Sequence, residues 1–306
     1  MKSDFLYLLL LNYFFSLFKR NFTPLSWLYL VILLNKSIIC EIMNLSRLVL
    51  DVVKIVTIAG KEIMKIYNTQ DFGIQYKTDD SPVTIADHAS NTILIERLTA
   101  LTPNIPIVSE ESIEIPFSER QNYEYFWMID PLDGTKEFIA RNGDFAVNIA
   151  LIFKNKPILG VIYVPNTEGV YYAVKNKGSF KIDGGKKQKI ACNTFNINDL
   201  GLRIPVSRSF FNDATKKLIA ENYKEPVLLP RGSALKFMNI AEGSADVYPR
   251  IGRTMEWDTA ACQIIIEEAG GQILEMTTQK PLQYNKPSLF NPDFIALGRL
   301  LGTKIG

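Results

Sequence analysis

Apolar residues recur every three or four positions along residues 44–67. This spacing places them on one side of a helix, and Asn44 or Ser46 stands where an N-cap residue is expected. The pattern predicts an amphipathic helix that packs against a core.

Thr84 and Asp87 have the spacing of a capping box, which predicts a second helix from Thr84 to about Leu101. A short strand is expected before it, over residues 74–77. In the structural interpretation the Asp87 carboxylate caps its own helix. In the functional alternative the same carboxylate faces a metal cluster.

Residues 144–153 alternate between apolar and polar positions, which is typical of a strand with one buried face. Similar short runs separated by turn residues predict a large antiparallel sheet. The strands are expected at 106–109, 125–129, 144–153, 158–164, 169–174 and 179–182. The polar stretch 113–124 predicts a mobile loop, and residues 184–187 predict a surface turn.

After residue 190 the pattern changes to alternating helices and strands, which predicts an α/β half. Strands are expected at 202–206, 227–229, 245–248, 272–275 and 294–297, and helices at 213–222, 232–242 and 257–269. The fold class is therefore α/β, with an α+β half over 43–190 and an α/β half over 191–306.

Residues 1–42 differ from the rest because they contain two apolar runs, 5–18 and 22–34. Neither run reaches the ~18 residues expected of a membrane-spanning helix. Three interpretations remain: a membrane anchor, a hairpin dipping into the bilayer, or a segment translated upstream of the true start. We expect Met43 to begin the functional unit. An anchor would attach the chain to the cytoplasmic face of the inner membrane.

The amino-acid composition limits the partners and the catalytic groups that this protein can use. The 306 residues carry a net charge of +2 with scattered Lys and Arg, so a nucleic-acid polymer is not a favoured partner. The three cysteines are far apart and are interpreted as reduced thiols in the cytoplasm. His88 is the single histidine, which argues against a His/Cys zinc site and a Ser-His-Asp triad. Any hydrolysis must then depend on carboxylates and metal ions.

The motif Asp-Pro-Leu-Asp-Gly-Thr begins at Asp130, directly after a predicted buried strand. A turn of this kind can direct the carboxylates of Asp130 and Asp133 and the carbonyl of Leu132 at one point. Thr135 stands where a helix could begin, so nearby backbone N–H groups can face an anion. Oxygen ligands beside a phosphate-binding helix start indicate divalent cations and phosphoryl chemistry. The structural alternative is a capped strand–turn–helix junction.

Several other residues stand at strand ends or helix starts, where phosphates and cations bind well. Glu110 follows an apolar strand, and Asp258 has the position of a helix N-cap. Ser207, Arg208 and Lys236 offer hydroxyl and cationic groups. Each of them taken separately could equally be structural.

Three separated motifs occur in order: Ser109-Glu110-Glu111, the motif from Asp130 to Thr135, and Trp257-Asp258-Thr259-Ala260-Ala261. Together they resemble the lithium-sensitive, magnesium-dependent phosphomonoesterase family, which includes inositol monophosphatase. The resemblance covers residues 43 to about 300 and implies a layered α/β/α/β/α sandwich. Five segments are similar to its bisphosphate nucleotidase branch: 79–84, 133–138, 206–209, 232–237 and 248–250.

The resemblance also implies roles for individual residues. It assigns Glu110, Asp130, Asp133, Asp258 and the Leu132 carbonyl as ligands of two or three Mg²⁺ ions. Asp87 and Thr135 would orient and deprotonate the attacking water. The implied substrate contacts are Gly134, Thr135, Ser207, Arg208, Gly232, Ser233, Lys236, Arg250 and Asp258.

The implied activity is removal of the 3'-phosphate of adenosine 3',5'-bisphosphate, which makes a small phosphorylated nucleotide the expected partner. An inositol or sugar monophosphatase of the same fold is the first alternative. The second is a catalytically silent, membrane-attached binding protein, although the complete set of carboxylates argues against it. The sequence leaves monomer and homodimer both open.

Overall fold

The computed structural model describes residues 44–78 and 80–301, and the larger of its two compact units begins at Val49. The predictions for residues 1–42, which include one of the three cysteines, Cys40, lie outside the described residues. The same holds for Met43 and Asp79. Within the described part of the chain, no helix is long and apolar enough to cross a membrane.

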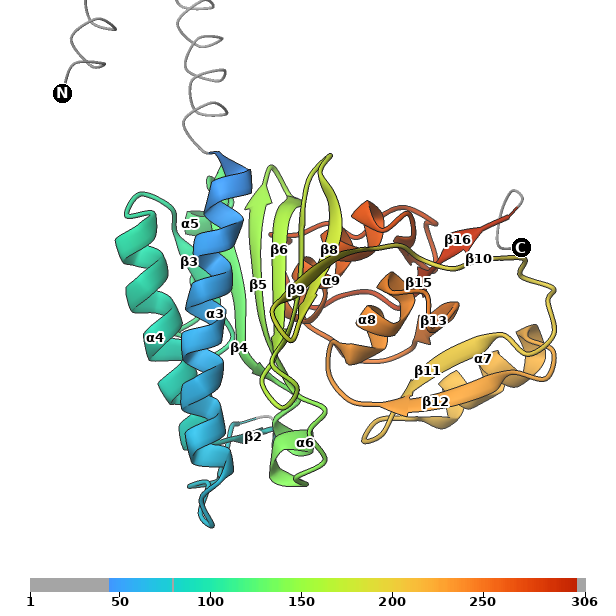
Figure 1. The fold of residues 1–306 in the computed structure, drawn as a ribbon, viewed down its shortest axis with the longest axis horizontal. Coiled ribbons are helices and arrows are strands. Elements are labelled where there is room, and N and C mark those ends of the chain that lie inside the picture. Colours follow the sequence, from blue (N-terminus) through green and yellow to red (C-terminus); the bar gives the residue numbers. More distant parts are fainter. Residues whose placement is uncertain (1–43, 79, 302–306) are drawn as a thin grey trace, which may run out of the picture. The chain divides into compact units, whose positions relative to one another are not determined.

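The helices and strands follow the predicted order closely (Figure 1). The helices are α3 (Leu45–Tyr67), α4 (Ile85–Leu101), α5 (Phe117–Arg120), α6 (Thr135–Ile139), α7 (Asp213–Asn222), α8 (Leu235–Ala241) and α9 (Glu256–Glu268). The strands before residue 192 are β1 (Gln75–Tyr76), β2 (Pro82–Val83), β3 (Ile107–Ser109), β4 (Tyr125–Asp133), β5 (Ala146–Phe153), β6 (Lys156–Val164), β7 (Gly169–Val174), β8 (Gly178–Asp183) and β9 (Lys186–Ile190). The later strands are β10 (Thr194–Phe195), β11 (Arg203–Ser207), β12 (Val227–Arg231), β13 (Val247–Arg250), β14 (Gln272–Glu275), β15 (Phe294–Leu297) and β16 (Arg299–Leu300).

A seven-stranded sheet forms the centre of the larger unit, in the order β3-β4-β5-β6-β7-β8-β9. Its strands pair antiparallel except β3, which runs parallel to β4. The prediction of a large antiparallel sheet is therefore confirmed for the hairpins. The parallel β3 has a consequence for the site, because β3 and β4 end at the same edge of the sheet.

Helices cover both faces of this sheet. On one side α3 approaches β6 so closely that a Cβ on Gly60 would lie 2.1 Å from the Tyr163 ring. On the other side α9 lies against β6, where a Cβ on Gly160 would lie 2.7 Å from the Ala261 carbonyl oxygen. At such crossings glycine is required because any side chain would separate the layers.

The C-terminal half adds two further layers. Strand β15 pairs antiparallel with both β13 and β14, and β11 pairs parallel with β12. Side chains of β11, β13, β14 and β15 share a core with Ile219 of α7. Strands that share a core with helices in this way form the predicted α/β half, and the layered α/β/α/β/α arrangement is confirmed. The proposed domain boundary near residue 190 stays a prediction.

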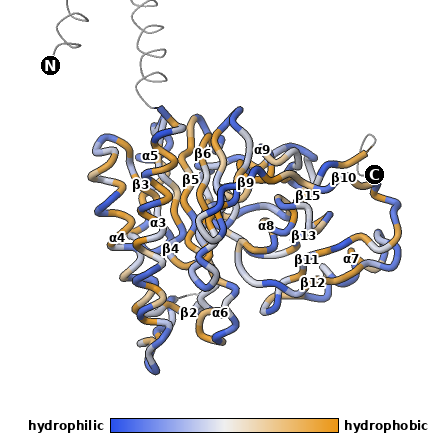
Figure 2. Tube along the Cα trace, viewed as in Figure 1, coloured by the Kyte–Doolittle hydropathy of each residue, from blue (hydrophilic) through white to orange (hydrophobic). Residues whose placement is uncertain are grey.

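Three local predictions were wrong. The alternation in β5 suggested one buried face, but every residue from Ala146 to Ile152 is buried because helices cover both faces. The loop 113–124 contains α5, which carries the buried Arg120. Residues 186–187 belong to β9, an edge strand that is hydrophilic along most of its length (Figure 2).

Candidate metal and phosphate site

The end of β4 carries the two aspartates of the central motif. The strand continues beyond the predicted end at Ile129, with a register shift against β5 between Asp130 and Asp133. The chain then turns at Gly134, whose φ of 95° is in the left-handed region that favours glycine. Helix α6 begins at Thr135, so the predicted strand–turn–helix junction is confirmed.

Three of the predicted metal ligands meet at one point. Carboxylate oxygens of Glu110, Asp130 and Asp258 lie within 4.8 Å of one another. Glu110 follows the end of β3, Asp130 lies in β4, and Asp258 lies in the first turn of α9. Because β3 and β4 are parallel neighbours, their ends place Glu110 and Asp130 at the same edge of the sheet.

Like charges held this close and away from water raise each other's pKa. Burial, followed by repulsion from Glu110 and Asp133, raises the pKa of Asp130 well above its usual value. Burial and repulsion from Asp133 and Glu110 do the same for Asp258. A divalent cation removes this repulsion, and carboxylate oxygens are the ligands that Mg²⁺ prefers. The cluster therefore fits a metal ion.

Asp133 lies beside this cluster and is fixed by the C-terminal half of the chain. Its Oδ2 accepts hydrogen bonds from Ser233 Oγ at 2.7 Å and from the Ala234 N–H at 2.6 Å. Asn148 Nδ2 of β5 donates to the same oxygen at 3.2 Å. Asn148 Oδ1 is buried without a hydrogen-bond partner among the described residues. An orphaned oxygen at this place is consistent with a missing ion or water.

Asp87 caps its own helix, as one of the two alternatives predicted, and it is also bonded to Thr135 of the central motif. One carboxylate oxygen, Oδ2, accepts hydrogen bonds from the Thr84 N–H and Oγ1, which completes the capping box. The other oxygen accepts a hydrogen bond from Thr135 Oγ1 at 3.0 Å. Burial raises the pKa of Asp87, although the hydrogen bonds from Thr84 and Thr135 act in the opposite direction. A fixed carboxylate of raised pKa, bonded to a hydroxyl at the site, is suited to accept a proton.

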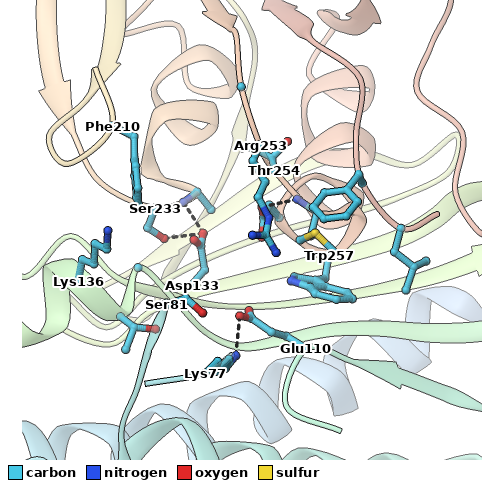
Figure 3. A pocket seen from close by; sticks show the side chains of 18 of the residues that line it. Lys77, Ser81, Glu110, Asp133, Lys136, Phe210, Ser233, Arg253, Thr254 and Trp257 are labelled. Atoms are coloured by element: carbon cyan, nitrogen blue, oxygen red, sulfur yellow. Dashed lines mark hydrogen bonds and ion pairs between the residues drawn. The ribbon is translucent and has the colours of Figure 1, made fainter. Parts of the chain in front are cut away.

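Lys77 donates a hydrogen bond to Glu110 of the carboxylate cluster, which is drawn as a dashed line in Figure 3. Its Nζ lies 3.0 Å from Glu110 Oε1 and 2.6 Å from Glu111 Oε1. Burial acts to lower the pKa of Lys77, but these two carboxylates outweigh it and raise the pKa above its usual value. Lys77 thus stays charged and holds Glu110 in place.

A pocket of about 850 Å³ opens over these residues and is lined in part by Glu110, Asp133, Gly134, Thr135 and Asp258. In Figure 3, Lys136 and Phe210 lie at its left end and Trp257 at its right.

The left end of the pocket is cationic. Lys136 Nζ lies 4.2 Å from the centre of the Phe210 ring, and the Arg250 guanidinium lies 5.8 Å from the same ring. Lys236 also lines the pocket, and burial lowers its pKa to about 8. Its Nζ donates to the carbonyl oxygen of Ser233, which is neutral. A buried cation paired with a neutral partner is suited to bind an anion.

Three predicted substrate contacts do not line this pocket: Ser207, Arg208 and Gly232. Ser207 Oγ accepts the Phe210 N–H at 3.0 Å. The Arg208 guanidinium donates to Asp144 Oδ2 at 2.7 Å, and the Gly232 N–H donates to the same oxygen. The assignment of these three residues as direct substrate contacts stays a prediction.

The predicted cap at the start of α9 was misplaced. The N-cap is Met255, and Asp258 lies three residues inside, where its Oδ2 accepts the Met255 N–H at 2.7 Å. An acidic residue in this position stabilises the first helical turn. Asp258 therefore caps its helix with one oxygen while its carboxylate contributes to the cluster.

The match to known proteins agrees with this geometry. The model of the inositol monophosphatase family matches residues 45–300. The chain belongs to the inositol monophosphatase family. It is 39% identical over 251 residues to the 3'(2'),5'-bisphosphate nucleotidase CysQ of Aggregatibacter actinomycetemcomitans, covering 82% of this chain and 92% of that protein. It is 40% identical to CysQ of Escherichia coli K12 over 238 residues, covering 77% and 94%.

Two solved structures have folds similar to that of this chain. CysQ from Bacteroides thetaiotaomicron, a bacterial member of the inositol monophosphatase family, superposes with a TM-score of 0.72 at 35% identity, covering 82% of this chain and 97% of that one. The Thermotoga maritima inositol monophosphatase TM1415 superposes with a TM-score of 0.67 at 23% identity, covering 80% and 89%. That second likeness concerns the fold alone.

Sequence reasoning missed three residues at the site of this inositol monophosphatase family member: Lys77, Asn148 and Phe210. Asn148 carried a usable signal, because it is a polar residue inside the apolar run Ala146–Phe153. Phe210 follows the Ser207-Arg208-Ser209 segment but has no periodic pattern of its own. Lys77 could not be distinguished from other surface lysines.

Proposed function

We propose that this chain is a magnesium-dependent 3'(2'),5'-bisphosphate nucleotidase that releases the 3'-phosphate of adenosine 3',5'-bisphosphate to leave AMP. The observation that carries the proposal is the juxtaposition of the carboxylate cluster with a cationic pocket end. The CysQ relatives at about 40% identity support the same substrate class.

The carboxylate oxygens of Glu110, Asp130, Asp133 and Asp258 and the Leu132 carbonyl would hold two or three Mg²⁺ ions. Bound Mg²⁺ supplies Lewis-acid stabilisation of phosphoryl oxygens and lowers the pKa of water. The fit is supported by the 4.8 Å grouping of three carboxylates and by the orphaned Asn148 oxygen next to Asp133.

The protein's own groups direct the proton. Thr135 Oγ1 donates to Asp87 Oδ1 at 3.0 Å, which leaves the lone pairs of the hydroxyl available to accept a hydrogen bond from water. As that water attacks phosphorus, its proton would pass through Thr135 to Asp87, the bond between phosphorus and the 3' oxygen would break, and the leaving oxygen would take a proton from solvent to give the hydroxyl of AMP. Thr84 fixes Asp87 by two short hydrogen bonds, so the acceptor needs no reorganisation.

The reacting phosphate would be bound by the N–H groups of Gly134 and Thr135, next to the metal ligands. The second phosphate of the substrate would lie at the cationic end, near Lys236 and Arg250, with Ser233 beside them. Lys236 supports this placement because its buried charge has a neutral partner. Ser207, Arg208 and Gly232 would contribute to substrate binding from segments next to the residues that line the pocket.

An inositol or sugar monophosphatase activity is the second candidate, because the family model and the Thermotoga maritima neighbour share the fold. The cationic end of the pocket favours a substrate with two phosphates. We place the enzyme in the cytoplasm, which is supported by the free, buried thiols of Cys192 and Cys262.

Phosphate release tests the proposal directly. Adenosine 3',5'-bisphosphate, inositol 1-phosphate and fructose 1,6-bisphosphate are compared with Mg²⁺, with Mg²⁺ plus Li⁺, and with EDTA. We expect the highest kcat/KM with the nucleotide, and no turnover in EDTA. Preference for inositol 1-phosphate would overturn the nucleotidase assignment. Absence of turnover with any of the three would favour a silent binding protein.

A further inference from the structure

Arg120 of α5 is a buried cation that does not line the pocket. Its side chain is 1% exposed, and its guanidinium donates to four neutral oxygens. These are the carbonyls of Ile115, Lys286 and Pro287 and Asn285 Oδ1, at 3.2, 2.6, 2.8 and 2.9 Å. Burying a charge on neutral partners is unfavourable unless the bonds are well satisfied. The bonds here join two segments that are more than 160 positions apart.

Asn285 continues the connection. Its Nδ2 donates back to the Arg120 carbonyl at 2.7 Å, so the two residues are bonded reciprocally. The Asn285 N–H donates to Glu256 Oε2 at 2.6 Å. Asn285 has a φ of 63°, a left-handed conformation that asparagine tolerates better than most residues. The turn at Asn285 therefore lets this residue contact both Arg120 and Glu256.

Glu256 receives the other end of the network. Its side chain is fully buried, and it accepts hydrogen bonds from the Lys286 N–H at 3.0 Å and Lys286 Nζ at 2.5 Å. It is the first residue of α9, where a carboxylate is favoured by the helix dipole. Asp258 lies two positions later and so points to a different side of the helix. One helical turn thus carries a metal-site carboxylate and a carboxylate that fixes the helix.

The two ends of this network lead to the two sides of the carboxylate cluster. Ile115 and Arg120 belong to the segment that follows Glu110, and Glu256 begins the helix that carries Asp258. A second contact acts on the same helix start, because Asn291 Nδ2 donates to the Met255 carbonyl at 2.6 Å. Without a cation, the mutual repulsion of Glu110 and Asp258 acts to separate these segments.

We propose that Arg120, Asn285 and Glu256 are positioning residues that hold the Glu110 and Asp258 sides of the metal site at their binding distance. The inference rests on the proposed metal site but not on which phosphate ester is hydrolysed. Residues that orient metal ligands typically change metal affinity by about 10- to 100-fold when they are altered. The network should therefore control metal affinity more than the rate of the loaded enzyme.

Three variants of the full-length chain test this: Glu256→Gln, which preserves shape, Arg120→Lys and Asn285→Ala. The matched control is Arg203→Lys, which disturbs the ion pair of the half-exposed Arg203 with the buried Asp246, outside the pocket. Calorimetry gives the Kd for Mg²⁺, kcat is measured at saturating Mg²⁺, and urea unfolding in EDTA gives stability. We expect roughly tenfold weaker Mg²⁺ binding in the three variants, with kcat largely restored by excess Mg²⁺. Arg203→Lys should lose stability with an unchanged Kd.

The inference is overturned if Glu256→Gln binds Mg²⁺ as tightly as the wild type, or if Arg203→Lys weakens binding equally. Glu256→Gln decides the question if Arg120→Lys fails to fold. If the wild-type protein binds Mg²⁺ but prefers another phosphate ester, the nucleotidase proposal is wrong and the positioning role of Arg120, Asn285 and Glu256 is unaffected. Wild-type protein that binds no divalent ion overturns both the metal site and the positioning role.

Discussion

Two groups of carboxylates in this molecule, Asp246 and the cluster at the pocket, are stabilised in opposite ways. Asp246, between the second-half strands, accepts hydrogen bonds from the Arg203 N–H, Nε and Nη2 and from Asn193 Nδ2. Glu110, Asp130 and Asp258 instead face one another. The Asp246 charge is therefore neutralised by the fold. The cluster has one fixed cation, Lys77 at Glu110, and keeps a repulsion among its carboxylates that a bound metal ion would relieve. The first group serves stability and the second serves binding.

The largest expected effect is on turnover. Asp130→Asn keeps the shape of the side chain but removes a charged ligand, so we expect activity to fall by about 100-fold or more. Because the change also removes repulsion within the cluster, the free energy of unfolding in EDTA should stay the same or rise. Steady-state phosphate release and urea unfolding measure the two quantities. A large loss of stability in Asp130→Asn would contradict the conclusion that the cluster serves binding and not stability.

The corresponding change at the other group, Asp246→Asn, should leave kcat nearly unchanged and destabilise the fold by roughly 2 kcal/mol, since it weakens charged hydrogen bonds to a half-exposed arginine. Burial acts to raise the pKa of Asp246, but the bonds from Arg203 and Asn193 hold it below its usual value. This stabilisation is present above the unfolded pKa of about 4 and is lost as pH falls through the folded pKa. Urea unfolding from pH 7 to pH 3 should show a shallower acid decline in Asp246→Asn.

Metal addition sharpens the comparison. Mg²⁺ at 100 times its Kd should stabilise the wild type by about 2.7 kcal/mol, or roughly 5 °C in Tm. The increment should vanish in Asp130→Asn and persist in Asp246→Asn. Thermal unfolding with and without EDTA provides the measurement. An equal increment in all three proteins would show that Mg²⁺ binds elsewhere.

The smallest effect concerns Lys236, a buried cation that lines the pocket. Its pKa of about 8 means that its charge is lost as pH rises through that value. If it binds the second phosphate, KM for the nucleotide should rise by up to about tenfold between pH 7 and pH 9. Lys236→Met should have a raised KM at pH 7 and little further change. A wild-type KM that does not vary with pH would exclude this role.

Most structure that depends on neighbouring residues was predicted correctly from the sequence. The capping box of Thr84 and Asp87 forms as expected because its two residues are three positions apart. Helix α7 and strands β14 and β15 were predicted at their observed bounds, because their patterns also involve residues close together in the sequence. Strand β9 was missed because its lysines lack an apolar pattern, and it is specified by pairing with β8.

Other features depended on contacts distant in sequence. Both faces of β5 are buried because α3 and α9 belong to separate parts of the chain that cover one sheet. Arg120 appeared to lie in a polar loop, and its burial depends on acceptors at residues 285–287. Ser207 and Arg208 do not line the pocket, whereas Phe210 does, and this difference likewise depends on contacts with remote residues such as Asp144.

The sequence by itself determined the chemistry available to this protein: carboxylates at strand ends and helix starts, one histidine, and motifs that resemble a phosphatase family. Only the tertiary structure decided that Glu110, Asp130 and Asp258 share one site. The parallel pairing of β3 with β4 brings the first two together, and the packing of α9 on the sheet adds the third. Spacing along a chain fixes which residues share a turn, but the distance between remote turns is set by the core that packs between them.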